Sequence, residues 1–155
     1  IVEEVKLHRS KLVGPPQVFD VGTPNIPGVI GLGRACEYVL EIGVEKIAKR
    51  ERKLLEQMLE IADIAGVKVY GPSEAVQHGG VLSFNIRGLD HHKVASMLDE
   101  IAKIAVRSGH HCAQPTMNHL GVEGTVRASV HYYNTESEIE KFVTSVGEIA
   151  QEMCS

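Results

Sequence analysis

The sequence contains no tryptophan, and its aromatic fraction is only 5%. It has no apolar run that approaches the roughly 20 residues of a membrane span. Its first residues, Ile-Val-Glu-Glu-Val-Lys, lack the basic and apolar zones of a signal peptide. The net charge of -4 gives no basic surface for nucleic acid or an anionic membrane. We therefore expect a cytoplasmic protein that binds neither nucleic acid nor membrane.

Cysteine is also scarce. The three cysteines, Cys36, Cys112 and Cys154, are odd in number and far apart. This spacing excludes a disulfide framework and a Cys-x-x-Cys metal site. Reduced thiols in a cytosolic protein fit it best.

What the chain does contain is typical of a soluble globular domain. It has 155 residues, of which 43% are hydrophobic and 23% charged, enough for one domain with a real core. Residues 1–28 hold four of the six prolines and show little periodicity. We expect this irregular segment to pack against a second subunit or a missing part of the chain. The first residue is not Met, so we also expect a piece of a longer chain.

The hydrophobic pattern predicts an α/β chain, with a small α+β sandwich and a mostly antiparallel sheet covered by helices on one face. Asp90 is a plausible helix N-cap, and Val94, Leu98 and Ile101 should face inward from the helix that follows. His91 and His92 should lie on the surface. The expected elements are helices over 28–42 and 44–64, strands over 67–70 and 81–87, a helix over 91–102, a strand over 104–107, a short helix ending near Gly121, a strand over 125–133, and a last helix opened by the capping box Thr135-Glu136-Ser137-Glu138.

Residues 106–117 concentrate the chemistry. A cation, two imidazoles and a thiol lie within the six residues from Arg107 to Cys112. The polar loop composition favours an exposed Cys112 over a buried, inert one. Only a few per cent of a free thiol is ionised at neutral pH, and a nearby imidazolium, Arg107 or a helix N-terminus would raise that fraction. Cys112 is therefore the candidate nucleophile, whereas Cys36 and Cys154 have no such neighbours.

A metal site is the second interpretation of this stretch. His110, His111, Cys112 and His119 are all acceptable zinc ligands. However, adjacent residues of an extended loop point apart, and no second cluster lies nearby in the sequence. The pattern favours a site without metal.

Two arginines flank the thiol. Arg107 and Arg127 each lie on the more polar side of an expected strand. If those strands are neighbours, the two guanidinium groups converge, and their forks suit a carboxylate. The alternative is two separate surface arginines. A thiol beside a carboxylate clamp would fit an enzyme that acts on a small amino acid, although no electron sink is visible in the sequence.

Several motifs together resemble one family. Arg-Ser-Gly-His-His-Cys-Ala-Gln-Pro from Arg107, Gly-Val-Glu-Gly-Thr-Val-Arg-Ala-Ser up to Ser129, and Tyr-Asn-Thr at 133–135 resemble the C-terminal part of group II cysteine desulfurases. Upstream, Phe-Asp-Val-Gly-Thr-Pro-Asn over residues 19–25 resembles the segment that precedes a helix in that family. These are pyridoxal-phosphate enzymes of the class V aminotransferase group, to which selenocysteine lyase activity also belongs.

The resemblance implies roles for four residues. Cys112 matches the cysteine that attacks the substrate sulfur and becomes a persulfide. Arg107 matches the arginine that binds the substrate carboxylate, and Arg127 a second arginine of the substrate site. Thr23 matches a threonine that reaches the cofactor phosphate of the other subunit of a homodimer. The implied cofactor, pyridoxal 5'-phosphate, would supply the missing electron sink.

The resemblance also implies an architecture. Residues 29–155 would form the C-terminal small domain of a fold-type I transferase with its linking helices, and residues 1–28 the tail of a large cofactor domain with a dimer-contact loop. The family's Schiff-base lysine has no counterpart here, so the chain alone should be inactive. Implied partners are L-cysteine or L-selenocysteine and a sulfur-acceptor protein, in iron-sulfur cluster assembly or another sulfur-requiring pathway. The rival hypothesis is a stand-alone sulfur-carrier or interaction domain without cofactor.

Overall fold

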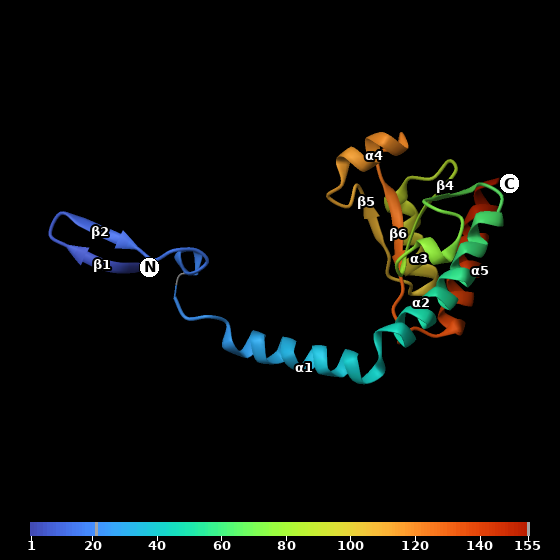
Figure 1. The fold of residues 1–155 in the computed structure, drawn as a ribbon. Helices are drawn as coiled ribbons and strands as arrows, with labels where there is room; N and C mark the ends of the chain where they lie inside the picture. The colour runs from blue at the N-terminus through green and yellow to red at the C-terminus, as the bar shows by residue number, and fades with distance from the viewer. Residues whose placement is uncertain (21, 155) are drawn as a thin grey trace. The chain divides into compact units, whose positions relative to one another are not determined.

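The computed structural model describes residues 1–20 and 22–154, apart from the side chains of Met153 and Cys154. The chain forms two compact units, residues 1–43 and 44–155 (Figure 1). The division predicted after residue 28 concerns the domains of a longer protein, and it stays a prediction. No helix within the described residues is both long and apolar enough to cross a membrane.

The first unit contains a hairpin where we expected irregular structure. Its strands pair in antiparallel fashion, and all of their residues are exposed. The helix that follows is capped by Asn25, whose Oδ1 accepts the Gly28 N–H at 3.1 Å. No residue of that helix is buried within the unit. The elements are β1 (Val2–Lys6), β2 (Arg9–Leu12), η1 (Gln17–Phe19) and α1 (Ile26–Ile42).

The second unit is a four-stranded antiparallel sheet with helices, as predicted. The strand order is β3-β4-β6-β5, so β5 and β6, the last two strands in the sequence, lie next to each other. Its strands are β3 (Val67–Tyr70), β4 (Val81–Ile86), β5 (Arg107–Gly109) and β6 (Thr125–Ser129), and its helices are α2 (Val44–Met58), η2 (Leu59–Asp63), η3 (Ala75–Gln77), α3 (His91–Ala102), α4 (Gln114–Leu120) and α5 (Glu136–Cys154).

The core lies between one face of this sheet and helices α2, α3 and α5 (Figure 1). Strand β4 alternates as its sequence predicts, with Leu82, Phe84 and Ile86 buried. Phe84 meets Phe142 of α5 edge to face, with ring centroids 5.8 Å apart. Each such large side chain contributes roughly 1.5–3 kcal/mol when it leaves water. The opposite face of the sheet is therefore left for the polar side chains.

Four expectations about this unit were wrong. The strand expected over 104–107 is formed instead by Arg107–Gly109, because α3 ends in a left-handed turn at Lys103 and pairing begins only where Arg107 meets β6. The second helix leaves α geometry after Met58, and β6 ends at Ser129. Ile101, expected inward, is 58% exposed.

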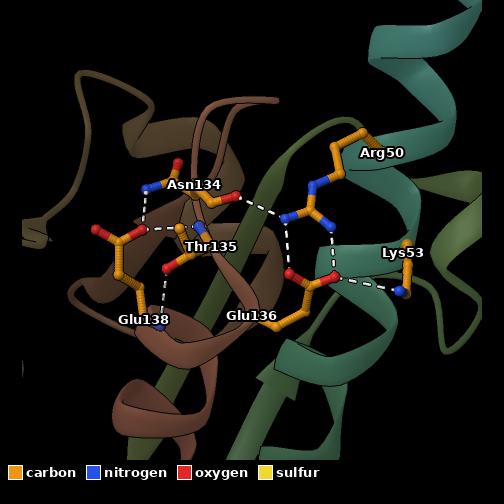
Figure 2. Close-up of polar contacts among 6 residues, drawn as sticks. All are labelled: Arg50, Lys53, Asn134, Thr135, Glu136 and Glu138. Carbon is orange, nitrogen blue, oxygen red and sulfur yellow. Dashed lines mark hydrogen bonds and ion pairs between the residues drawn. The ribbon is translucent and has the colours of Figure 1, made fainter.

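A polar network ties α2 to the start of α5 (Figure 2). Arg50 donates to both carboxylate oxygens of Glu136 and to the Asn134 carbonyl at 3.0 Å. The capping box is confirmed: the Thr135 N–H donates to Glu138 Oε2 at 2.8 Å, and the Glu138 N–H donates to Thr135 Oγ1 at 3.3 Å. This network fixes the chain that leaves β6.

Candidate active site

A row of polar residues crosses the face of the sheet that the helices leave uncovered. Arg107 of β5 lies directly opposite Arg127 of β6. Arg127 in turn opposes Ser83 of β4, and Ser83 opposes Tyr70 of β3. Directly opposed residues of neighbouring strands point to the same face, with Cβ atoms about 5 Å apart. The register therefore places all four side chains on one face.

The pairing of Arg107 with Arg127 is unusual. Like charges directly opposite each other destabilise a sheet. Arg127 is half-buried, and its Nε is buried with no hydrogen-bond partner among the described residues. A buried donor without an acceptor costs free energy, which an anion between the two guanidinium groups would recover. The register confirms that the two strands are neighbours and that Arg107 opposes Arg127, and the convergence of the two guanidinium groups stays a prediction.

Cys112 lies just beyond β5, close to one of these arginines. It is exposed, as predicted, and its Sγ lies 4.0 Å from Nη2 of Arg107. The thiolate is the nucleophilic form of cysteine. The other free cysteine of the described residues, Cys36, is exposed on α1 in the first unit. Cys154 cannot be compared with it, because its side chain lies outside the described part.

The two histidines before Cys112 have different environments. His110 is exposed, and its Nδ1 accepts the backbone N–H of Cys112 at 3.0 Å. His111 is half-buried against β6, and its Nε2 lies 3.0 Å from both the carbonyl oxygen and Oγ1 of Thr125. Burial lowers the pKa of His111, and the positive charges of Arg127 and Arg107 lower it further, against the opposing effect of the Thr125 hydrogen bond. These effects together favour the neutral form of His111.

Sequence reasoning missed three residues of this region. Thr125 is fully buried beneath the loop of Cys112. Asn85 donates from Nδ2 to the Gly124 carbonyl at 2.9 Å and to Tyr70 Oη at 3.4 Å. His91, expected on the surface, is only 13% exposed in its side chain. Alternation along the strands marks Thr125 and Asn85 as residues of the polar face, but no local pattern identifies their partners.

The remaining predicted site residue belongs to the first unit. Thr23 is exposed in the loop before α1, in the first unit. Val21, part of the motif that contains Thr23, lies outside the described residues. The role expected of Thr23 stays a prediction. For metal, the described residues contain no group of three or more side chains able to hold an ion.

The groups around Cys112 do not supply all that a pyridoxal-phosphate site requires. Such a cofactor is attached through a lysine amine. The described contacts of Cys112 supply guanidinium and imidazole but no amine. The amine of Lys68, on the edge strand β3, lies instead over the ring of Tyr70, with Nζ 5.0 Å from the ring centre. These residues fit the carboxylate of an amino acid, and they do not fit the covalent attachment of the cofactor.

Comparisons with known proteins agree on one family. The family model described as Aminotransferase class-V matches residues 1–142. The probable cysteine desulfurase of Pyrococcus abyssi is 47% identical over 154 residues, which cover 99% of this chain and 38% of that protein. The probable cysteine desulfurase of Methanothermobacter thermautotrophicus is 47% identical over 139 residues, covering 87% of this chain and 34% of that protein.

Solved structures give the same result. The apo cysteine desulfurase of Thermococcus onnurineus NA1 has a TM-score of 0.87 and 46% identity, covering 97% of this chain and 38% of its own. The S-sulfonic acid form of the cysteine desulfurase CsdA of Escherichia coli has a TM-score of 0.83 and 32% identity, covering 98% of this chain and 37% of its own. The chain thus spans little more than a third of the length of these relatives.

Proposed function

The chain belongs to the aminotransferase class-V family, and we propose that it is the part of a cysteine desulfurase that carries the sulfur-accepting thiol. The whole protein would remove sulfur from L-cysteine, giving L-alanine and a persulfide on Cys112. The observation that carries the proposal is the contact of the exposed Cys112 thiol with Arg107, which in turn opposes Arg127. A nucleophilic sulfur and a carboxylate clamp meet there.

The two arginines would hold the substrate carboxylate. Arg107 is exposed and adjacent to the thiol, whereas Arg127 is half-buried with an unpaired Nε. A guanidinium fork binds a carboxylate through two parallel hydrogen bonds, and it fixes orientation as well as position. A carboxylate held by Arg107 would bring the side chain of a small amino acid within reach of Cys112 Sγ.

Cys112 would then act as the nucleophile. Its thiolate forms a bond to the substrate sulfur while the carbon–sulfur bond of the substrate breaks. The electron pair of that bond stays on carbon, which takes up a proton to give alanine. Pyridoxal 5'-phosphate, on which this family depends in general, supplies the electron sink when bound. The lysine that holds it would come from outside this chain, and Thr23 would reach its phosphate in the partner subunit of a homodimer.

The persulfide on an exposed side chain is open to a second reaction partner. Cys112 lies in a loop at the surface of its unit, where the thiolate of a sulfur-acceptor protein could attack it. We place this transfer in the cytoplasm, upstream of iron-sulfur cluster assembly or another sulfur-requiring pathway. L-Selenocysteine would use the same site. The stand-alone sulfur-carrier hypothesis is not favoured, because the relatives named above are cysteine desulfurases over nearly this whole chain.

The test uses the full-length protein loaded with pyridoxal 5'-phosphate and supplied with L-cysteine. The unmodified protein should release alanine, and Cys112→Ser should lower that rate by at least about a hundredfold, as loss of a nucleophile does. Cys36→Ser is the matched control, since Cys36 is also an exposed free thiol, and it should keep the full rate. Full activity of Cys112→Ser would contradict the role of Cys112.

A further inference from the structure

The turn that carries Cys112 is held in an unfavourable backbone conformation. Gly109, His111 and Cys112 have φ values of 116°, 55° and 58°. Glycine adopts positive φ readily, but for two successive residues with side chains it costs free energy. Such conformations persist only where the surroundings impose them. The contacts of this turn therefore decide where the thiol lies.

Two of these contacts are local. The Cys112 N–H donates to His110 Nδ1 at 3.0 Å, and the Ala113 N–H donates to the His110 carbonyl at 2.8 Å. They set the shape of the turn, but they do not attach it to the sheet. His111 makes the attachment, since it reaches Thr125 on β6, fourteen positions along the chain.

The chemistry of this attachment fixes the state of the His111 ring. A backbone carbonyl only accepts hydrogen bonds, so Nε2 must carry the ring proton in order to donate to Thr125. The Thr125 hydroxyl oxygen, also at 3.0 Å, is a second acceptor for the same N–H. Nδ1 is buried and has no hydrogen-bond partner among the described residues, so nothing there competes for the proton. Two acceptors on one residue therefore set both the orientation and the tautomer of the ring.

Thr125 is well placed for this task. It is fully buried on β6, where it opposes Gly109, and it lies two positions before Arg127. One residue thus links the strand that carries Arg127 to the turn that carries the thiol. We infer that Thr125 is a positioning residue for the sulfur-transfer reaction, and that it acts through His111 to hold Cys112 beside Arg107. This inference rests on the proposed function.

Loss of the Thr125 hydroxyl should affect catalysis and leave substrate binding nearly unchanged. Without the Thr125 hydroxyl, His111 keeps only the carbonyl as an acceptor, and its ring gains freedom to rotate. The turn then leaves its left-handed conformation more often, and Cys112 Sγ spends less time beside Arg107. The arginines themselves stay on their paired strands. Loss of the hydroxyl should therefore lower kcat for L-cysteine and leave KM nearly unchanged.

The test compares Thr125→Val with Thr125→Ser in the full-length protein loaded with cofactor. Thr125→Val keeps the shape of the side chain and loses the hydroxyl, and it should lower kcat roughly fivefold, as the loss of one hydrogen bond does. Thr125→Ser keeps the hydroxyl and should restore kcat to within about twofold of the unmodified protein. The rate of Cys112 alkylation by iodoacetamide, without substrate, should change in Thr125→Val and recover in Thr125→Ser.

Two results would overturn the inference. One is a Thr125→Val protein whose kcat and alkylation rate are both unchanged. The other needs no variant: nitrogen NMR of the unmodified, histidine-labelled protein should find the proton of His111 on Nε2, and a proton on Nδ1 instead would contradict the geometry. The second measurement decides the matter if Thr125→Val does not fold. If the unmodified protein releases no alanine from L-cysteine, the proposed function fails, while alkylation and NMR still report on the turn.

Discussion

Arg107 has two neighbours with different electrostatic effects. A thiolate on Cys112, whose Sγ lies 4.0 Å from Nη2, would be attracted by the positive charge of Arg107, whereas the guanidinium of Arg127 on the paired strand repels Arg107. A substrate carboxylate would satisfy both arginines at once. The arginine beside the nucleophile is thus the one whose loss should most affect substrate binding.

We predict that Arg107→Ala raises the KM for L-cysteine in the full-length protein roughly tenfold to a hundredfold, the loss expected for a hydrogen-bonded charge pair. Arg107→Lys should recover only part of this, because it keeps the charge but not the fork. Steady-state kinetics measure both. Arg87→Ala, in the exposed turn after β4, is the control and should leave KM unchanged. Unchanged KM and kcat in Arg107→Ala would contradict the assignment.

His111 should make stability depend on pH. Its pKa in the folded protein lies below the ordinary 6.5 because of burial. Below about pH 6.5 the unfolded chain therefore binds a proton that the folded protein resists, and lowering the pH favours unfolding. We predict that the unfolding temperature falls more between about pH 7.5 and about pH 5.5 in the unmodified protein than in His111→Gln. Equal slopes for the two proteins would show that His111 does not titrate in this way.

At the scale of elements, the site depends on how the ends of the strands are held. Strand β6 carries Thr125 and Arg127, and the chain that follows it is fixed by the contact of Arg50 with Glu136 and Asn134 (Figure 2). On the other side, β5 and β6 approach closely at Gly109 and Gly124. A Cβ on Gly124 would lie 2.8 Å from the carbonyl carbon of Gly109. Both features can be tested by substitution.

The contact between Arg50 and Glu136 should stabilise the unit at neutral pH. The hydrogen bonds from Arg50 hold the pKa of Glu136 far below its ordinary value of 4.5. A depressed carboxyl pKa contributes stability above the unfolded pKa, and this stability is lost as the pH falls. We predict that Glu136→Gln lowers the unfolding temperature at pH 7 and that the difference shrinks below about pH 4.5. Glu140→Gln, on the exposed side of α5, should show neither effect, and an equal loss in both variants would contradict this role.

Gly124→Ala should push β5 away from β6. The new methyl group would overlap the Gly109 backbone, and we predict a loss of about 1–3 kcal/mol in the free energy of unfolding. Gly147→Ala is the matched control. Gly147 lies within helix α5, and a Cβ there would lie 3.7 Å from Ile64, which is an ordinary van der Waals contact. That variant should gain about 0.5–1 kcal/mol. Denaturant unfolding measures both, and a harmless Gly124→Ala would show that the strands can separate at little cost.

At the scale of the whole molecule, the parts that could be predicted from the sequence are those with local signals. Helix 91–102, its Asp90 cap and the capping box at Thr135 follow from periodicity and neighbouring residues, and all are confirmed. The N-terminal hairpin was missed because its residues are exposed on both faces and show no alternation. The prediction for β5 was misplaced because only three residues, Arg107–Gly109, form this strand, and their pairing with β6 is a tertiary contact.

The site could be predicted in part for the same reason. Cys112, Arg107 and Arg127 carry reactive or charged groups that are visible in the sequence, and the register confirms that the arginines are neighbours. Thr125 was missed, since a threonine in a strand is ordinary until its partner is known. Its contact with His111 is set by the packing of β6 against the Cys112 turn. Residues that act through tertiary hydrogen bonds leave no local signal.

The central claim is that Cys112 receives the substrate sulfur, and one measurement tests it directly. The full-length protein, loaded with pyridoxal 5'-phosphate, is mixed with L-cysteine in the absence of an acceptor. Its thiols are then alkylated, the protein is digested, and the peptides are mapped by mass spectrometry. The account predicts one additional sulfur atom on the peptide that contains Cys112 and none on the peptide that contains Cys36, the other exposed free thiol among the described residues. Alanine release with no additional sulfur on Cys112 would contradict it.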